Sequence, residues 1–233
     1  MTAAHLPARA LGTLALLALI WGTNWPLMPL AVREISVWTF RGFALTVAGL
    51  TMLAVARGRG LSLVVPRQDW GTLAAASFAY LIIWNVASTL SAVLLPSGQA
   101  AILGFTMPLW AALLGVVLLK QRLNGRLLTA LALGAAAVAL LMWRSLPAYA
   151  GAPLGFVWGL LAGLGWACGT LILQRRPPSV QLLVSTGWQL LGAGVPIAAV
   201  ALVVGQGWRV ESWFMPSPQT LLVVAYITVV PMT

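Results

Sequence analysis

The chain has 233 residues, of which 61% are hydrophobic and 7% are charged, and its mean hydropathy is +0.97. Because a soluble domain carries roughly 25% charged residues, this composition excludes an ordinary soluble fold and predicts a protein that crosses the membrane several times. The net charge of +10 does not predict nucleic-acid binding, because the thirteen Lys and Arg lie mostly in short segments between apolar runs.

The first apolar run, residues 10–32, is too long for a typical signal-peptide core, so it predicts a membrane helix. A second helix fits residues 37–56 if Arg41 is tolerated within it. Arg41 is then the one charge inside a predicted span, where an uncompensated cation is costly. Its long side chain either extends to the headgroups or contacts a substrate carboxylate or a neighbouring helix.

Residues 70–119 are long enough for two helices, with a turn at LLPSG, where Pro96 and Gly98 interrupt the backbone. The second of these helices, residues 98–119, is uncharged, and about 20 apolar residues in a helix cross the hydrocarbon core. Near its middle, Thr106 is followed by Pro108, which removes a backbone donor and predicts a helix kink. The kink serves either packing or gating.

Further apolar runs predict helices to the end of the chain, giving seven complete spans and an eighth that begins near Pro218. The eighth stops at VVPMT without the polar or basic cap that usually ends a span, so we expect a longer protein cut within this helix. These runs cover residues 127–143, 145–174, 177–208 and 212–233.

The positive charges predict a cytoplasmic N-terminus. With that orientation, nine of the thirteen Lys and Arg fall in inner segments and three in outer ones, as the positive-inside rule requires. The inner residues are Arg9, Arg57, Arg59, Arg67, Lys120, Arg122, Arg126, Arg175 and Arg176.

The sixth predicted helix repeats features of the first. LAGLGWACGT, residues 161–170, aligns with LLALIWGTNW, residues 16–25, and this places Trp166 on Trp21. A looser match pairs Gln189 with Arg41. An offset of five helices inverts the second copy in the membrane, and inverted repeats are typical of secondary transporters that rock around a midplane site.

Three segments, IWGTNW, SGQAAILGFTMPLWAALLGVVLLKQRL and LGWACGTLILQRR, resemble the EamA-type transporters of the drug/metabolite transporter superfamily. The resemblance implies an all-α membrane protein with ten helices in two inverted five-helix repeats. The first repeat would be residues 10–143 and the second residues 153–233, truncated after part of the eighth helix. The resemblance also implies a location in the bacterial inner membrane and export of amino acids or other metabolites. Gln121 departs from the family, which often has a glutamate there.

Polar side chains inside the predicted spans are costly, so they are candidates for a substrate pathway. Amides and hydroxyls orient a substrate, and indole rings supply apolar area and attract ammonium groups. Each candidate has a structural alternative, because Trp often anchors a helix at the membrane interface and buried Asn often links helices. Together with Arg41, the candidates are Trp21, Asn24, Trp84, Asn85, Thr106, Trp166 and Gln189.

Two further features constrain the mechanism. The three acids lie at predicted membrane edges, so the sequence offers no midplane carboxylate for carrying a proton. In the sixth helix, glycines four residues apart predict a face on which a neighbouring backbone packs closely. The acids are Glu34, Asp69 and Glu211, and the glycines are Gly155, Gly159 and Gly163.

These observations predict a secondary transporter that exports small metabolites by alternating access, with no catalytic residue, cofactor or metal. Its expected partners are a small-molecule substrate and membrane lipids but no nucleic acid, and the sequence leaves a homodimer open. One alternative is a non-transporting membrane subunit or inactive fragment. Another is a lipid-modifying membrane enzyme, which the lack of an H-E-x-x-H motif and of an intramembrane acid pair disfavours.

Overall fold

The computed structural model describes residues 8–121, 124–204 and 216–230. Within these ranges all regular secondary structure is helical, and seven helices are long and apolar enough to span a membrane, as predicted. They are α1 (Ala8–Ala31), α2 (Val37–Gly58), the continuous α3, η1 and α4 (Arg67–Ala76, Ser77–Ile83 and Trp84–Leu94), α5 and α6 (Ser97–Gly104 and Met107–Leu119), α7 (Gly125–Gly151), α8 (Pro153–Arg175) and α9 (Leu182–Val204). A shorter apolar helix, α11 (Pro218–Val229), follows. Outside the described residues lie His5, Arg122, Arg209, Glu211 and Trp213.

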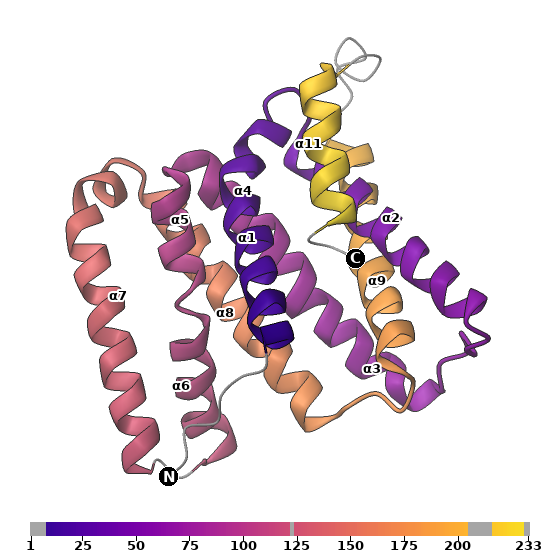
Figure 1. Cartoon of the computed structure of the whole chain (residues 1–233), viewed down its shortest axis with the longest axis horizontal. Helices are drawn as coiled ribbons and strands as arrows, with labels where there is room; N and C mark the ends of the chain where they lie inside the picture. The colour runs from indigo at the N-terminus through magenta and orange to yellow at the C-terminus, as the bar shows by residue number, and fades with distance from the viewer. Residues whose placement is uncertain (1–7, 122–123, 205–215, 231–233) are drawn as a thin grey trace.

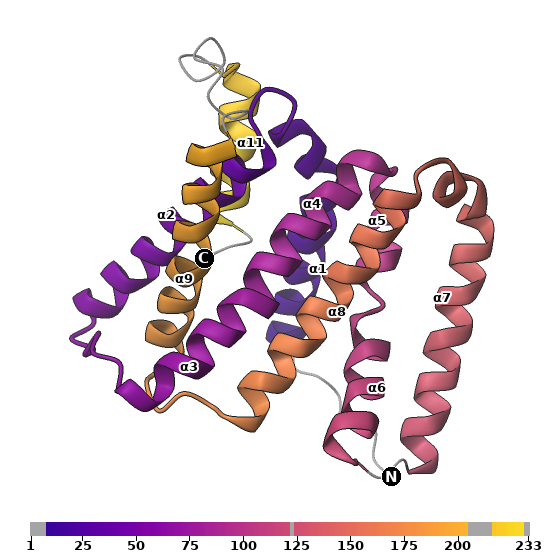
Figure 2. The same ribbon diagram turned by 180° about the vertical axis from the view of Figure 1, so that it is seen from behind.

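The span formed by α3, η1 and α4 crosses the middle of the molecule beside α8 (Figures 1 and 2). The pair α2 and α9 forms one edge of the bundle, and α6 and α7 form the other. α1 lies over the central helices, where it contacts α4, α5 and α11. The helices that carry Trp21, Trp84 and Trp166 therefore meet at the centre, whereas Arg41 and Gln189 lie on the edge pair α2 and α9.

Two prolines divide the spans as expected. α4 ends at Leu94, and α5 begins directly after Pro96. The fourth span is broken at Phe105 and Thr106, and Pro108 lies in the first turn of α6. The N–H groups of a first turn make no hydrogen bond within the helix, so proline is tolerated there. The predicted kink is thus a complete helix break.

Glycines bring the backbones of α2 and α9 into contact. A Cβ atom added at Gly42 would lie 2.8 Å from the Cα of Ala198, and one added at Gly49 would lie 2.9 Å from the backbone N of Leu191. Side chains at these positions would force the helices apart. Glycine therefore sets the separation of this helix pair.

The predicted glycine face of α8 packs as expected. Gly155 faces Leu94 and Leu95, while Gly159 faces Leu103 so closely that an added Cβ would lie 2.6 Å from the Leu103 Cβ. All three glycines of the face are buried, and they allow α8 to lie close to α4 and α5.

One helix extends beyond the apolar run that predicts it. The run of residues 127–143 stops before the charge of Arg144, but α7 continues to Gly151. The exposed side chain of Arg144 points out of the protein core, so its charge does not require the helix to end there. Ala152, whose backbone is not helical, instead separates α7 from α8.

Candidate functional site

Four aromatic rings from three spans meet at the centre of the bundle, and we call them the aromatic cluster: Trp21, Tyr80, Trp84 and Trp166. The ring centroid of Trp166 lies 5.4 Å from that of Trp21, 4.8 Å from that of Trp84 and 4.3 Å from that of Tyr80. The Trp21 and Trp84 contacts are edge-to-face, an arrangement that aromatic quadrupoles favour. Three of the predicted pathway residues are therefore brought together.

Helical spacing explains how the sequence builds this cluster. Tyr80 and Trp84 are four residues apart in a continuous helix, so their side chains share one face. Trp21 and Trp25 share a face of α1 for the same reason, and the Trp25 ring contacts Trp84 with centroids 6.1 Å apart. Tyr80 was not predicted, although its spacing from Trp84 was visible in the sequence.

On α1 and α6, two polar atoms are buried without a hydrogen-bond partner among the described residues. They are the Oδ1 of Asn24, one turn from Trp21 on α1, and the Nε1 of Trp110 on α6. A buried polar atom without a partner costs free energy that a bound polar group can recover. These atoms are therefore potential contacts for a ligand.

Arg41 is buried, with 1% of its surface exposed, so the expectation that its side chain extends to the headgroups is wrong. The Nε of Arg41 instead donates to the Oγ1 of Thr89 on α4, at 2.7 Å. Its guanidinium carbon also lies 4.7 Å from the ring centroid of Phe40. The alternative of a hydrogen bond between helices holds.

Asn85 continues this polar region on α4. Its Nδ2 donates to the backbone oxygen of Leu81 at 2.9 Å, while its Oδ1 is buried without a partner among the described residues. The hydroxyl of Thr89 donates to the backbone oxygen of Asn85 at 2.7 Å and is thereby oriented to accept from Arg41. Thr89 was not predicted, although it lies one turn from Asn85.

The remaining candidates are held by local hydrogen bonds. Thr106 is buried against Gly163 and donates to the backbone oxygen of Leu103 at 2.6 Å. Gln189 is buried on α9, where its Nε2 donates to the Oγ of Ser185 at 2.9 Å. Thr106 thus lies at the α5–α8 contact, whereas none of the aromatic contacts described above involves Gln189.

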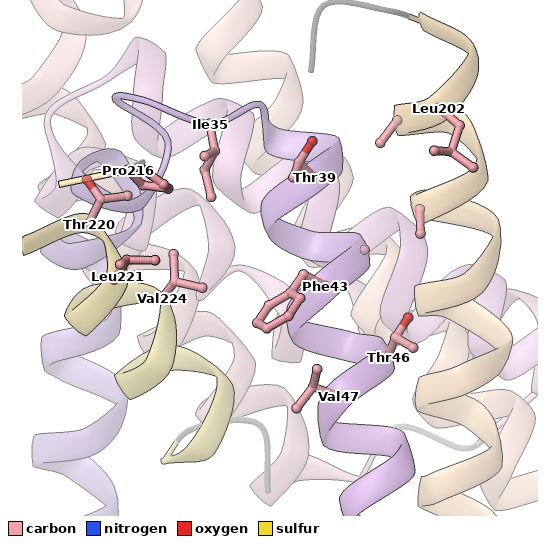
Figure 3. A pocket seen from close by; sticks show the side chains of 13 residues that line it. Ile35, Thr39, Phe43, Thr46, Val47, Leu202, Pro216, Thr220, Leu221 and Val224 are labelled. Carbon is pink, nitrogen blue, oxygen red and sulfur yellow. The ribbon is translucent and has the colours of Figure 1, made fainter. Parts of the chain in front are cut away.

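A cavity of about 520 Å³ lies between α2, α9 and the beginning of α11 (Figure 3). Apolar side chains such as Phe43, Val47 and Leu202 form most of its wall, with the hydroxyls of Thr39 and Thr46 among them. None of the predicted pathway residues lines this cavity. Its apolar wall offers few groups to orient a polar substrate, so the aromatic cluster and Arg41 are the better candidate site.

Two carboxylates join segments that are far apart in the sequence. Asp69, at the start of α3, accepts from the backbone N and the Oγ of Ser179, at 2.9 and 2.5 Å. Glu34, between α1 and α2, accepts from the backbone N of Ser217 at 2.6 Å. This backbone hydrogen bond is the main reason that the pKa of Glu34 lies below its ordinary value.

Residues 9–143 match the model of the EamA-like transporter family, and this match covers more than half of the chain. The chain belongs to the EamA-like transporter family. It is therefore a multi-pass membrane protein of a transporter family, in agreement with its seven candidate spans.

Relatives of this EamA family member include several proteins named as transporters. A probable amino-acid metabolite efflux pump of Escherichia coli is 26% identical over 234 aligned residues, which cover 94% of this chain and 73% of the pump. The uncharacterized transporter YvbV of Bacillus subtilis is 23% identical, with 93% of this chain and 70% of YvbV covered. Protein PecM of Dickeya dadantii is 33% identical over 47% of this chain, and the match spans 37% of PecM. No solved structure matches the chain.

Proposed function

We propose that this EamA family member is a secondary transporter that exports small amphipathic metabolites, amino acids among them, across the bacterial inner membrane by alternating access. The main support for the proposal is the aromatic cluster, because its rings come from α1 and α4 of the first proposed repeat and from α8 of the second. A site shared between two moving units is the central requirement of alternating access. The printed name of the Escherichia coli relative supports the same substrate class.

The helix contacts support two inverted repeats, residues 10–143 and residues 153–233. In such a repeat α8 corresponds to α1, α9 to α2, and α11 to the span that ends in α4. The pairs α4–α8 and α1–α11 are both in contact, and exchanging corresponding helices converts one pair into the other. The pair α2–α9 is in contact and maps onto itself under the same exchange, as a helix pair on the repeat axis would.

The two carboxylate contacts support alternating access in the same way. Asp69 with Ser179 joins the start of α3, in the third span of the first repeat, to the segment that follows α8, the first helix of the second repeat. Glu34 with Ser217 joins the segment that follows α1, the first helix of the first repeat, to the start of α11, the third helix of the second repeat. Inverted repeats place equivalent contacts at opposite membrane surfaces. Asp69 with Ser179 would then close the cytoplasmic end, and Glu34 with Ser217 would close the outer end.

Transport by the purified chain in liposomes tests this function. We expect uptake of radiolabelled leucine or phenylalanine to be saturable and to exceed uptake by protein-free liposomes. A folded protein that moves none of a panel of amino acids and organic acids would instead support the alternative of a non-transporting membrane subunit. Circular dichroism of the reconstituted protein establishes that it is folded.

A further inference from the structure

Arg41 has donors that the described chain leaves unused. A guanidinium carries five N–H groups, and within the described residues only the one on Nε has a hydrogen-bond acceptor, the Oγ1 of Thr89. The Nη1 and Nη2 atoms are buried and have no partner among the described residues. A planar fork of N–H donors fits the two oxygens of a carboxylate, which accepts from it through two parallel hydrogen bonds.

The charge of Arg41 also lacks an anionic partner in the part of the chain that the structure describes. Of the two acids there, Glu34 accepts from Ser217 and Asp69 accepts from Ser179. The ring of Phe40, 4.7 Å from the guanidinium carbon, compensates part of the charge through its quadrupole. A buried cation in a membrane span is stable only with such compensation, so an anion from outside the described chain would complete the site.

The α4 segment that carries Thr89 also carries other groups able to bind a ligand. Asn85, one turn before Thr89 on α4, has a buried Oδ1 with no partner among the described residues, and this oxygen can accept from an ammonium or a hydroxyl group. The adjacent residue, Trp84, belongs to the aromatic cluster, which offers apolar area. The segment of α4 from Trp84 to Thr89 therefore carries an aromatic ring, an acceptor that is unpaired among the described residues and the hydroxyl that bonds to Arg41, with Trp84 and Asn85 on different faces of the helix.

We propose that Arg41 binds the carboxylate of the transported molecule, with Thr89 holding the guanidinium in place, so that the substrates are small apolar carboxylates. This inference rests on the proposed function and adds to it the substrate class and the residue that selects it. The guanidinium is enclosed in this conformation, so a substrate reaches it only when the two repeats move apart.

Matched probe pairs that differ only at the carboxyl group test the proposal. In detergent, binding of leucine and leucinamide, and of benzoate and benzamide, is measured by the change in tryptophan fluorescence. We expect the parent to bind each carboxylate at least about ten-fold more tightly than its amide. In Arg41→Gln the preference should fall to within about two-fold, and Arg41→Lys should keep part of it as a point charge.

Two control variants test whether the preference depends on an exposed positive charge or on a counter-charge within the protein. Arg144→Gln removes an exposed cation of α7 and should leave the preference unchanged. Glu211, which lies outside the described residues, tests for a counter-charge within the protein, and Glu211→Gln should also leave the preference unchanged. If Glu211→Gln alters the preference as strongly as Arg41→Gln, Arg41 is paired within the protein and the proposal is wrong.

The outcomes separate this proposal from the proposed function. A parent that shows no preference for the carboxylate in either pair, or an Arg41→Gln protein that keeps the full preference, overturns the carboxylate site while transport in liposomes can still occur. A parent that binds the carboxylates with the expected preference but carries no flux keeps the site and overturns the transporter. If Arg41→Gln does not fold, the test uses the carboxylate preference of the parent and its partial retention in Arg41→Lys.

Discussion

The two carboxylate contacts use similar chemistry in different surroundings. Asp69 has 8% of its surface exposed and accepts two hydrogen bonds from one residue, Ser179, whereas Glu34 is exposed and accepts from the backbone of Ser217. Hydrogen bonds to a buried carboxylate are worth more than those that water and salt screen. Under the proposed function, the Asp69 contact therefore holds its end of the protein closed more firmly than the Glu34 contact holds the other end.

The first way to test this comparison is to establish which contact faces the cytoplasm. In a Cys168→Ala background, a cysteine at Gln121 should resist an impermeant thiol reagent in intact cells, and one at Arg33 should react fully. The positive-inside rule is the reason, because Lys120 and Arg126 flank the first position. Labelling of Gln121→Cys in intact cells would reverse the assignment of the two ends.

The largest stability effect is expected at Asp69. Hydrogen bonds to a charged group contribute about 1.5–3 kcal/mol each, so Asp69→Ala, which removes two, should lower the free energy of unfolding by about 3–6 kcal/mol. Ser179→Ala removes the hydroxyl and leaves the backbone donor, so we expect a loss of about 1.5–3 kcal/mol. Denaturant unfolding in detergent measures both, with the exposed neighbour Gln68→Ala as control. Losses below about 0.5 kcal/mol at Asp69 would mean that this contact does not hold the end closed.

The smallest effect is expected at Glu34. Because the pKa of Glu34 is lowered in the folded protein, its contact stabilises the protein above the ordinary pKa of 4.5 and is lost as the pH falls through the lower, folded value. The melting temperature of the parent should therefore exceed that of Glu34→Gln slightly at pH 7, and the two should converge below pH 4.5. A difference that persists unchanged to the lowest pH would exclude the carboxylate as its cause.

Much of the fold follows from the sequence, because the membrane restricts a chain to a few structures. Uncharged runs of sufficient length become helices, and Pro96 and Pro108 interrupt them as their missing backbone donors require. The end of α7 does not follow from its apolar run, because an exposed Arg144 is compatible with a continuing helix. Local sequence does not show whether a charged side chain on a helix points into the protein core or away from it.

The candidate site was predicted less completely, because it depends on how helices pack. The aligned repeat identified Trp21 and Trp166, whose rings prove to be in contact. The surroundings of Arg41 could not be predicted, because its Thr89 partner lies 48 residues away and helix packing alone brings the two together. The sequence therefore identified Arg41 as a charge within a span that needs compensation, and the tertiary structure identified Thr89 as its partner.

Transport by Trp166→Ala tests the central claim, a pathway through the aromatic cluster, most directly. An aromatic contact is worth on the order of 1 kcal/mol, so the apparent affinity for leucine in proteoliposomes should fall several-fold or more. The matched control, Trp143→Ala, removes a ring of which 72% is exposed on α7 and should leave transport unchanged. The amount of each variant in the liposomes is measured to correct the rates. If Trp166→Ala transports leucine with the parental rate and affinity, Trp166 is a packing residue and the pathway lies elsewhere.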